Sequence, residues 1–553
     1  MSEEFPSALS RREFLKRAGA SGVAVAAGTF GRAAAGAGGG TPEQVHLTWG
    51  ADPSSEVVVS WCTVEAAVNP RVHYGPTPAL GRIVPAETRR YVDGLSGETV
   101  ICHHARLSGL APASTVHYAV TADNDAKQDR PFAAGFVTAP RERRGFRFTS
   151  YGDLATPNTQ WTISSPQARH AIVAVERFAP LFHLLNGDLC YANLNPTAQP
   201  AVWRDFGDNV EPSAARRPWM PCPGNHEIEF NNGAQGYGGY LARYALPANG
   251  TRFPGRWYAF RVGGVLFVSL DANDVVHQDC GPLVNGPRPL VPALNAGQPP
   301  IAPGTALYVR GYSGGEQTRW LEQTLRAARA DAGLDWIVVQ MHEDAMSSSD
   351  PGNGSDKGIR EAWLPLFDTY GVDLVLCGHD HDYERTFPVR GRHHDTGRDV
   401  ATGEPVDTLQ PIPLVREDPA DGVYDSPQGA IHLVLGGGGT GAPLGVYGRD
   451  PQSGAPLAKV FTKRNAPRPG AKPGTFMRAK ADAVEAAIWS ARRDTESAYG
   501  IAVFDVHYDE TPGMTSITLS YWHTVGAVPT GDYELFEKIV LRKKRKDALR
   551  NSS

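Results

Sequence analysis

The chain is organised around the segment Leu374-Val375-Leu376-Cys377-Gly378-His379-Asp380-His381. Its first four residues are apolar and follow a helix-like segment, so they are predicted to form a buried strand. In extended backbone, residues two apart face the same way, so the side chains of His379 and His381 should converge just beyond the strand's carboxyl end. Open α/β sheets usually place their sites there. The histidine pair therefore indicates metal ligands, with a hydrogen-bonded loop pair as the alternative.

From residue 145 onward, strand-like and helix-like segments alternate on both sides of this strand. The strands are apolar throughout, which predicts sheets that are covered by helices. We therefore expect an α/β (α+β) domain over residues 145–545. Its other strands are expected at 146–151, 181–185, 257–261, 265–270, 336–340, 430–435, 499–506 and 516–522, and its helices at 166–178, 316–329 and 359–370.

Further polar clusters stand where expected strands of this domain end or where loops leave it. Such clusters would bring carboxylate, phenol, amide and imidazole groups toward one edge of the sheets. This convergence is hard to explain as core packing, because these side chains are rarely buried without a role. The residues are Asp153, Asp188 with Tyr191, Asn225 with His226, and His342.

Residues 42–139 are predicted to form a small all-β domain. Short strands alternate there with turn signals. The run from Leu107 to Pro112, followed by Tyr118, resembles a corner of immunoglobulin and fibronectin III-like sandwiches, in which a tyrosine hydroxyl bonds back to the chain. Trp61 would be the core tryptophan. The polar, proline-containing segment 138–145 marks the expected boundary with the second domain.

The first 35 residues are predicted to be an export signal. Ser10-Arg11-Arg12-Glu13-Phe14-Leu15-Lys16 precedes an apolar, small-residue stretch that ends in Ala33-Ala34-Ala35, a pattern typical of twin-arginine signal peptides. A weak amphipathic helix is the alternative. Export by this route would make the protein a bacterial one that is secreted, periplasmic or held in the cell envelope. It would also favour a cofactor that is loaded before export.

Composition limits the partners that the chain can have. The 553 residues are 41% hydrophobic and 20% charged, with a formal net charge of -5. This balance gives no overall basic field, so no nucleic-acid partner is expected, and the N-terminal apolar stretch is too short for a membrane span. The six cysteines lack C-x-x-C spacing, which argues against a zinc ribbon or a thioredoxin-type centre. Disulfide pairing and oligomeric state stay open.

Two segments near the C-terminus lie outside this pattern. Residues 391–428, rich in Pro, Asp, Gly and Arg, are predicted to be a surface excursion. The basic run Arg542-Lys543-Lys544-Arg545-Lys546 is predicted to be a solvated terminus, with binding to an anionic cell envelope as the alternative.

The order of the polar clusters resembles that of the purple acid phosphatases within the calcineurin-like metallophosphoesterase superfamily. That family's blocks read G-D-x-G, G-D-x-x-Y, G-N-H-D/E, V-x-x-H and G-H-x-H. The resemblance is strong from about residue 145 to 390, and it implies a metallophosphoesterase sandwich of two β-sheets flanked by helices. The matching segments are Gly152-Asp153-Leu154-Ala155, Gly187-Asp188-Leu189-Cys190-Tyr191, Gly224-Asn225-His226-Glu227, Val339-Gln340-Met341-His342 and Gly378-His379-Asp380-His381, which continues as Tyr383-Glu384-Arg385.

The resemblance also implies a dinuclear metal centre. The first ion would be held by Asp153, Asp188, Tyr191 and His381, and the second by Asp188, Asn225, His342 and His379. A carboxylate can span two ions about 3.5 to 4 Å apart, so one shared aspartate suits such a site. A phenolate favours a hard trivalent ion, which the family resemblance makes Fe(III). The second ion would be Zn(II), Fe(II) or Mn(II).

The implied activity is hydrolysis of small phosphate monoesters, as in an acid phosphatase. The two cations would supply a hydroxide that attacks phosphorus in line with the leaving alcohol. His226 would not bind metal. It would stabilise the developing charge and protonate the leaving oxygen.

The sequence departs from the family's pattern in two places. Ala155 stands where the first block has glycine, a small change that should leave Asp153 in place. Family members commonly carry further histidines after V-x-x-H, whereas Glu343 and Asp344 follow here, and acidic groups would weaken attraction for a monoester dianion. A phosphodiesterase acting on a nucleotide or a phospholipid headgroup is therefore the first alternative. The second is an envelope-binding protein whose β-domain binds while its metal domain is inert.

Overall fold

The computed structural model describes residues 39–229, 231–278, 311–425, 428–441, 445–462, 466–467, 476–477, 483–508, 510–525 and 531–550. The predicted export signal, residues 1–35, and Cys280 lie outside these residues. Among the described residues, no helix is long and apolar enough to cross a membrane.

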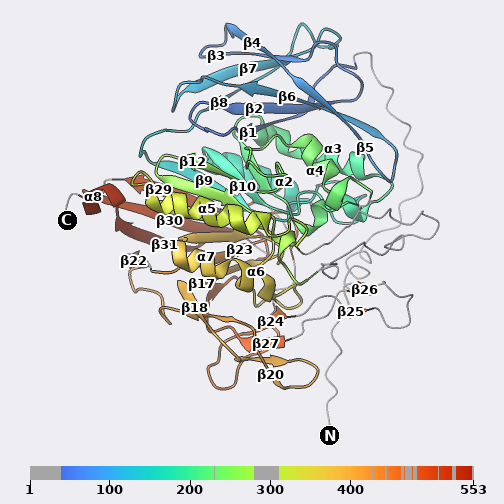
Figure 1. The fold of residues 1–553 in the computed structure, drawn as a ribbon. Coiled ribbons are helices and arrows are strands. Elements are labelled where there is room, and N and C mark those ends of the chain that lie inside the picture. Colours follow the sequence, from blue (N-terminus) through green and yellow to red (C-terminus); the bar gives the residue numbers. More distant parts are fainter. Residues whose placement is uncertain are drawn as a thin grey trace. The chain divides into compact units, whose positions relative to one another are not determined.

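Two four-stranded antiparallel sheets form the N-terminal domain (Figure 1, blue). Trp61 and Tyr118 lie in the core between them, each at most 1% exposed. The predicted all-β domain is confirmed. One sheet has the order β1 (Glu43–Trp49), β2 (Val57–Thr63), β6 (Thr99–Leu107), β5 (Glu87–Val92), and the other has the order β4 (Arg82–Pro85), β3 (Arg71–Gly75), β7 (Thr115–Thr121), β8 (Phe132–Val137).

From the sequence we expected the hydroxyl of Tyr118 to bond back within the sandwich, and this expectation is wrong. The hydroxyl donates to the carbonyl oxygen of Ala215, at 2.7 Å, in the following domain. Ala215 caps helix α3 (Gln199–Ala214), whose last carbonyls have no partner within the helix. The corner tyrosine therefore joins the sandwich to its neighbour.

Two seven-stranded mixed sheets form the centre of the second domain, and a five-stranded sheet and two pairs of short strands are added to them. In each seven-stranded sheet, a run of neighbouring strands is parallel, so their carboxyl ends meet at one edge. The first sheet has the order β11 (Trp219–Cys222), β10 (Phe182–Asn186), β9 (Phe146–Tyr151), β29 (Gly500–Tyr508), β30 (Met514–Thr524), β31 (Tyr533–Lys544), β22 (Val423–Asp425). The second has the order β12 (Tyr258–Val262), β13 (Val265–Ser269), β14 (Trp336–Gln340), β16 (Leu374–Cys377), β23 (Ile431–Leu435), β17 (Tyr383–Thr386), β28 (Ser490–Arg493).

Aromatic side chains fill the space between the two sheets. The ring of Phe148, on β9, stacks on that of Phe504, on β29, with centroids 4.5 Å apart. It also meets Phe267, on β13 of the other sheet, edge to face at 5.1 Å. Such pairs add to the burial energy of each ring and fix how the sheets face each other. The predicted two-sheet sandwich is confirmed.

Helices cover the outer faces of both sheets (Figure 1). Helices α2 (Gln167–Phe178) and α3 contribute Val175 and Phe206 to the core of the first sheet. Helices α5 (Glu316–Ala330) and α7 (Leu364–Tyr370) contribute Leu321 and Phe367 to the core behind the second sheet. Two shorter helices, α4 (Gly238–Arg243) and α6 (Lys357–Ala362), follow polar loops, and α8 (Lys546–Arg550) ends the described chain.

The excursion at 391–428 is tied to the domain by buried charges. The guanidinium of Arg385, whose side chain is fully buried, pairs with Asp418 at 2.7 Å. Glu485, which forms a buried ion pair with Arg360, accepts a hydrogen bond from the hydroxyl of Thr408. The excursion contributes β22 to the first sheet, and it also forms the short strands β18 (Val389–His393), β19 (Gly397–Asp399), β20 (Pro405–Val406) and β21 (Gln410–Pro413).

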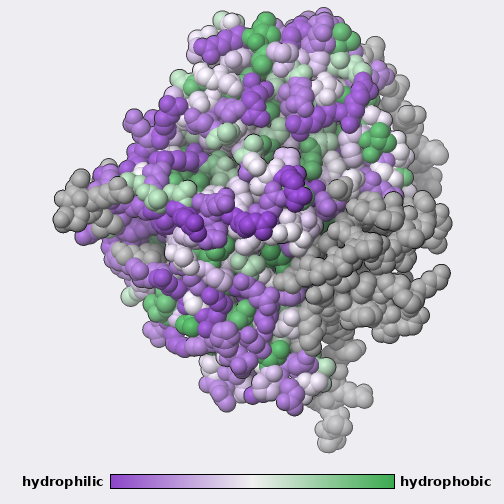
Figure 2. All heavy atoms as spheres, in the orientation of Figure 1, coloured by the Kyte–Doolittle hydropathy of each residue, from purple (hydrophilic) through white to green (hydrophobic). Residues whose placement is uncertain are grey.

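The basic run at 542–546 is not a solvated terminus, so that prediction is wrong. Arg542 pairs with Asp425 at 2.7 Å, and the ammonium group of Lys543 lies 3.9 Å from the centroid of the Trp336 ring. Lys546 donates to the carbonyl of Ala328, at 3.0 Å, near the C-terminus of α5. These three cations have partners within the fold, and the run as far as Lys544 belongs to strand β31. On the face shown in Figure 2, hydrophobic side chains are scattered among hydrophilic ones.

Candidate metal centre

The predicted site residues follow the carboxyl ends of strands in both sheets. Asp153 follows β9, Asp188 and Tyr191 follow β10, and Asn225 and His226 follow β11 in the first sheet. His342 follows β14, while His379 and His381 follow β16 in the second sheet. The structure brings all eight residues together where these strand ends meet.

One group of side chains centres on the phenol of Tyr191. Its oxygen lies 3.0 Å from Oδ1 of Asp153 and 3.1 Å from Nε2 of His381. The same imidazole nitrogen is 3.3 Å from Oδ1 of Asp153. A phenol, a carboxylate and an imidazole thus present their donor atoms to one small volume.

A second group centres on the imidazole of His342. Its Nε2 lies 3.1 Å from Oδ2 of Asp188, 3.2 Å from Oδ1 of Asn225 and 3.2 Å from Nδ1 of His379. Asp188, His342 and His379 offer donor atoms within 4.8 Å of one another and could hold a metal ion. The backbone N–H of His379 donates to Asp153 at 2.9 Å, which links the two groups.

Glycines leave the room that these groups need. A Cβ on Gly224 would lie 2.3 Å from Oδ1 of Asp188, and one on Gly378 would lie 2.5 Å from Oδ2 of Asp153. A Cβ on Gly187 would lie 2.5 Å from Nδ1 of His342. The glycine that opens each of these blocks is therefore fixed by close approach of the donors.

Four of the candidate ligands have a left-handed backbone. This conformation is costly for residues other than glycine, and it persists only where surrounding structure enforces it. Its presence at four neighbouring donors indicates that the fold holds them in a set geometry. The φ angles are 58° at Asp153, 50° at Asp188, 59° at Tyr191 and 68° at His379.

Two residues that the sequence did not single out support this geometry. The buried carboxylate of Glu227 accepts the backbone N–H groups of Asp188, Leu189 and Gly224, each at 2.8 Å. Its place three residues after Gly224, as in a capping box, was an available signal. Asn193 lies 2.9 Å from His226, and nothing in the local sequence pointed to that contact.

The contact with Asn193 orients the ring of His226. Since an amide oxygen can only accept, Oδ1 of Asn193 receives the proton of Nδ1. The other ring nitrogen, Nε2, then lies 3.8 Å from Oδ2 of Asp188. His226 is buried and holds this nitrogen beside the candidate ligands.

The electrostatics of the site fit a bound cation. Burial lowers the pKa of His342, but the carboxylates of Asp188 and Asp153 outweigh it and hold that pKa well above its usual value. The carboxylates thus favour a positive charge at this position, and a bound metal ion would supply one. Burial also raises the pKa of the Tyr191 phenol well above its usual value, so binding as a phenolate needs a strong cation.

The acidic residues that follow His342 are packed away from solvent. Glu343 and Asp344 are each 1% exposed, and burial raises the pKa of both carboxyl groups well above the usual range. Within the described part of the chain, neither carboxyl oxygen of Glu343 has a hydrogen-bond partner. A buried acid without a hydrogen-bond partner is costly, and a nearby cation would reduce that cost by favouring its ionised form.

Family models match the chain in two consecutive regions. The model described as "Purple acid Phosphatase, N-terminal domain" matches residues 42–134, and that described as "Calcineurin-like phosphoesterase" matches residues 167–383. The chain belongs to the purple acid phosphatase family.

Relatives of this purple acid phosphatase family member match it over 62% to 98% of its length. The uncharacterized protein Rv2577 of Mycobacterium tuberculosis is 40% identical, over 98% of this chain and 97% of that one. Purple acid phosphatase 15 of Arabidopsis thaliana is 28% identical, over 62% and 64% of the two chains. The structure of purple acid phosphatase PPD1 from yellow lupin seeds covers 93% of this chain and 76% of that one, with a TM-score of 0.61 and 19% identity, and shows the shared fold.

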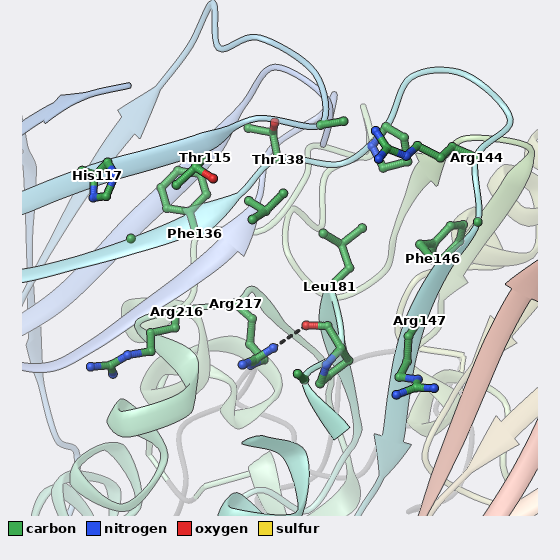
Figure 3. A pocket seen from close by; sticks show the side chains of 17 residues that line it. Thr115, His117, Phe136, Thr138, Arg144, Phe146, Arg147, Leu181, Arg216 and Arg217 are labelled. Atoms are coloured by element: carbon green, nitrogen blue, oxygen red, sulfur yellow. Dashed lines mark hydrogen bonds between the residues drawn. The ribbon is translucent and has the colours of Figure 1, made fainter. Parts of the chain in front are cut away.

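A cavity of about 650 Å³ lies away from the metal centre of this purple acid phosphatase homologue (Figure 3). It is bounded by β7, β8 and β9 and is lined by apolar residues and four arginines, and no candidate ligand is among them. Arg147 pairs with Asp505 at 2.8 Å, while Arg217 pairs with Glu176 at 2.8 Å and donates to the carbonyl of Pro180. These two arginines therefore have structural roles.

Proposed function

We propose that this protein is an exported dinuclear-metal hydrolase of phosphate monoesters. The observation that carries the proposal is the convergence of Tyr191, Asp153 and His381 beside the group around His342. Two adjoining sets of donors, one with a phenol and the other rich in neutral groups, suit two unlike cations. When bound, such a pair supplies a nucleophilic hydroxide and stabilises the charge on the phosphoryl group.

The two sets of donor residues would bind different metal ions. Asp153, Tyr191 and His381 would hold Fe(III), because a phenolate prefers a hard trivalent ion. The second set would hold Zn(II), Fe(II) or Mn(II), since amide and imidazole donors accept each of these. Asp188 would be shared. The second set consists of Asn225, His342 and His379.

His226 would act as the general acid. Asn193 accepts its Nδ1 proton, so Nε2 is the nitrogen left to carry a proton toward the leaving oxygen. Nε2 lies 3.8 Å from Oδ2 of Asp188, which places it beside the candidate metal ligands. A positioned general acid accelerates departure of an alcohol by about 10² to 10⁴.

Export rests on the first 35 residues. Paired arginines, the apolar stretch and the alanine run favour twin-arginine export to the periplasm, the envelope or the medium. Since that route carries folded proteins, the metals would be loaded first. Protease protection of the full-length chain in whole cells, compared with an Arg11→Lys and Arg12→Lys variant, tests this part of the proposal.

A phosphodiesterase is the second candidate, favoured by the surroundings of the site. The segment after His342 turns its polar groups inward, where Ser348 binds Glu384. Arg493, a nearby cation, is engaged by Asp382 and Glu384 at 3.2 and 3.0 Å. A diester carries one negative charge where a monoester dianion carries two, so it needs less cationic support.

The deciding experiment compares an aryl phosphate monoester with its bis-aryl diester on protein of measured metal content. A large monoester preference that His379→Ala abolishes would support the proposed function. A diester preference that the same variant abolishes would support the second candidate. No turnover of either ester by metal-loaded protein would overturn both.

A further inference from the structure

The N-terminal sandwich touches the loop that carries Asn225 and His226. Its strands β5 and β6 are joined by a tight turn that contains Asp93 and Gly94. The backbone N–H of Gly94 donates to Oδ1 of Asn232 at 2.6 Å, and the amide nitrogen of Asn232 lies 3.0 Å from Oδ2 of Asp93. Asp93 and Asn232 are each 1% exposed, so these polar contacts are shielded from water.

Asn232 in turn fixes the course of the loop. Its side chain lies 2.8 Å from Oε2 of Glu229, and its carbonyl accepts the N–H of Gly238 at 2.7 Å. Glu229 is 1% exposed and also accepts the indole N–H of Trp203, on α3, at 2.5 Å. The hairpin formed by β5 and β6 therefore contacts a loop segment that is held by several hydrogen bonds. This segment begins at Glu229, three residues after His226.

The turn of the hairpin is itself rigid. Oδ1 of Asp93 accepts the backbone N–H of Ser96 at 2.7 Å and its hydroxyl at 2.8 Å. The backbones meet closely, because a Cβ on Gly94 would lie 2.3 Å from the carbonyl oxygen of Asn231. A displacement of the hairpin would therefore be transmitted to the loop.

The sandwich also holds the helix in which the loop ends. Helix α4 begins at Gly238, and its last carbonyls lack partners within the helix. Nε2 of His104 lies 3.0 Å from the carbonyl of Ala242, and Nε2 of His46 lies 3.0 Å from that of Arg243. The hydroxyl of Thr48 donates to the carbonyl of Ala245 at 2.8 Å. The loop is thus anchored to the sandwich at its middle and at its end.

We propose that the N-terminal sandwich positions the loop of Asn225 and His226, with Asp93, Gly94 and Asn232 as positioning residues for phosphoryl transfer. The inference rests on the proposed function. Its physical basis is that a shift of about 1 Å in a catalytic group can cost about 10²-fold in rate. The sandwich is then a working part of the active site, and its separation from the second domain would disable catalysis.

The test inserts a methyl group between hairpin and loop. Gly94→Ala places a Cβ 2.3 Å from the carbonyl oxygen of Asn231, so the hairpin and the loop must move apart, while the φ angle of Gly94 itself is one that alanine can adopt. Gly81→Ala is the matched control, because no atom lies within 4 Å of its Cβ position. Both variants are compared with wild type on an alkyl phosphate and on nitrophenyl phosphate.

Gly94→Ala is expected to lower kcat on the alkyl phosphate by about tenfold or more, because that alcohol needs His226 to leave. On nitrophenyl phosphate, whose leaving group needs little protonation, kcat should fall by less than about threefold. Gly81→Ala should match wild type on both. A mere loss of folded protein would lower both rates equally, so an unchanged ratio of the two rates in Gly94→Ala overturns the inference.

A second measurement does not depend on activity. Amide hydrogen exchange of residues 223–238 should be faster in Gly94→Ala than in Gly81→Ala, because opening of the loop costs less. Asn232→Ala removes the contacts with Asp93 and Gly94, together with that to Glu229, without added volume, and serves if Gly94→Ala does not fold. If wild type hydrolyses neither ester, the proposed function fails, and the exchange measurement still decides the positioning role. Equal exchange in the variant and the control overturns it.

Discussion

Glu227 holds Asp188 in place by accepting its backbone N–H at 2.8 Å. The same carboxylate accepts the backbone N–H of Gly224, which is next to Asn225. It therefore joins the two loops that carry these candidate ligands. It is fully buried, and although burial raises its pKa, the backbone N–H donors of Gly224 and Leu189 favour its ionised form. A single side chain away from the ligand set thus sets the spacing between two ligands.

Replacing Glu227 by glutamine should lower both stability and metal content. The amide has one acceptor oxygen in place of two, and its NH2 group would face backbone donors, at a cost of about 1 to 3 kcal/mol in the free energy of unfolding. Urea unfolding and elemental analysis of the purified variant measure the two effects. Glu322→Gln, on the exposed face of α5, is the control. Metal content equal to that of wild type would contradict the role given to Glu227.

His226→Ala should keep both metals and lose rate on poor leaving groups. We expect a loss of about 10² to 10⁴ on an alkyl phosphate, because a general acid contributes that much. His394→Ala, in the exposed excursion, is the control for loss of a histidine. The leaving-group dependence of kcat is the measurement. An alkyl phosphate rate that survives the substitution would remove His226 from the mechanism.

Metal removal should destabilise the protein, and readdition should restore it. A cation that binds only the folded state at one hundred times its Kd adds about 2.7 kcal/mol. Thermal unfolding of chelator-treated protein, titrated with zinc or manganese, measures this effect. His379→Ala should lose most of the gain, whereas His394→Ala should keep it. Equal gains in both variants would place the metal elsewhere.

Acid should weaken the contact between the sandwich and helix α4. Burial lowers the pKa of His104 to about 3, from an ordinary value of 6.5. Between these values the unfolded chain binds a proton that the folded protein does not, so stability falls as pH drops, by up to about 1.4 kcal/mol per unit. His104→Gln keeps a donor for Ala242 but does not titrate. Urea unfolding at pH 7 and pH 4.5 should show a smaller loss in this variant, and equal losses would refute the assignment.

Cys62 and Cys102 should form a disulfide under oxidation. They are direct partners on β2 and β6, their sulfurs lie 3.0 Å apart, and both are buried. Exchange with oxidised glutathione would join the two sulfurs, with the two thiol protons passing to two molecules of reduced glutathione. Peptide mapping after thiol alkylation should find this cross-link in wild type and not in Cys62→Ser. Free Cys102 in fully oxidised wild type would exclude the pair.

The convergence of the candidate ligands could be predicted because each block is local. In each block a polar residue comes shortly after the end of a strand, and in four of the five blocks a glycine precedes it, so the short-range sequence indicates both the strand end and the candidate donor. Asn193 was missed because its partner, His226, is far along the chain and joins it only in the folded state. The basic terminus was misjudged for the same reason, since its charges are visible in sequence whereas Asp425 and Trp336 are distant partners.

The fold itself was predictable in kind but not in strand order. Apolar strands between helices indicate covered sheets, which the structure has. The tyrosine corner was expected to close within the sandwich, but Tyr118 donates to Ala215 because the end of α3 offers an unpaired carbonyl there. Contacts between residues so far apart in the sequence depend on how whole domains pack, and the local periodicity of the sequence does not predict them.

Strand β9, which leads into Asp153, is paired on one side by β29 near the end of the chain, with Ser150 opposite Ala502. During synthesis, β9 therefore stays an open edge until more than 350 further residues have been translated, as the separation of these partners requires. The nascent polypeptide therefore cannot complete the candidate metal centre until β29 has emerged from the ribosome. A premature stop shortly before residue 500 would destroy the centre while leaving every ligand in the product.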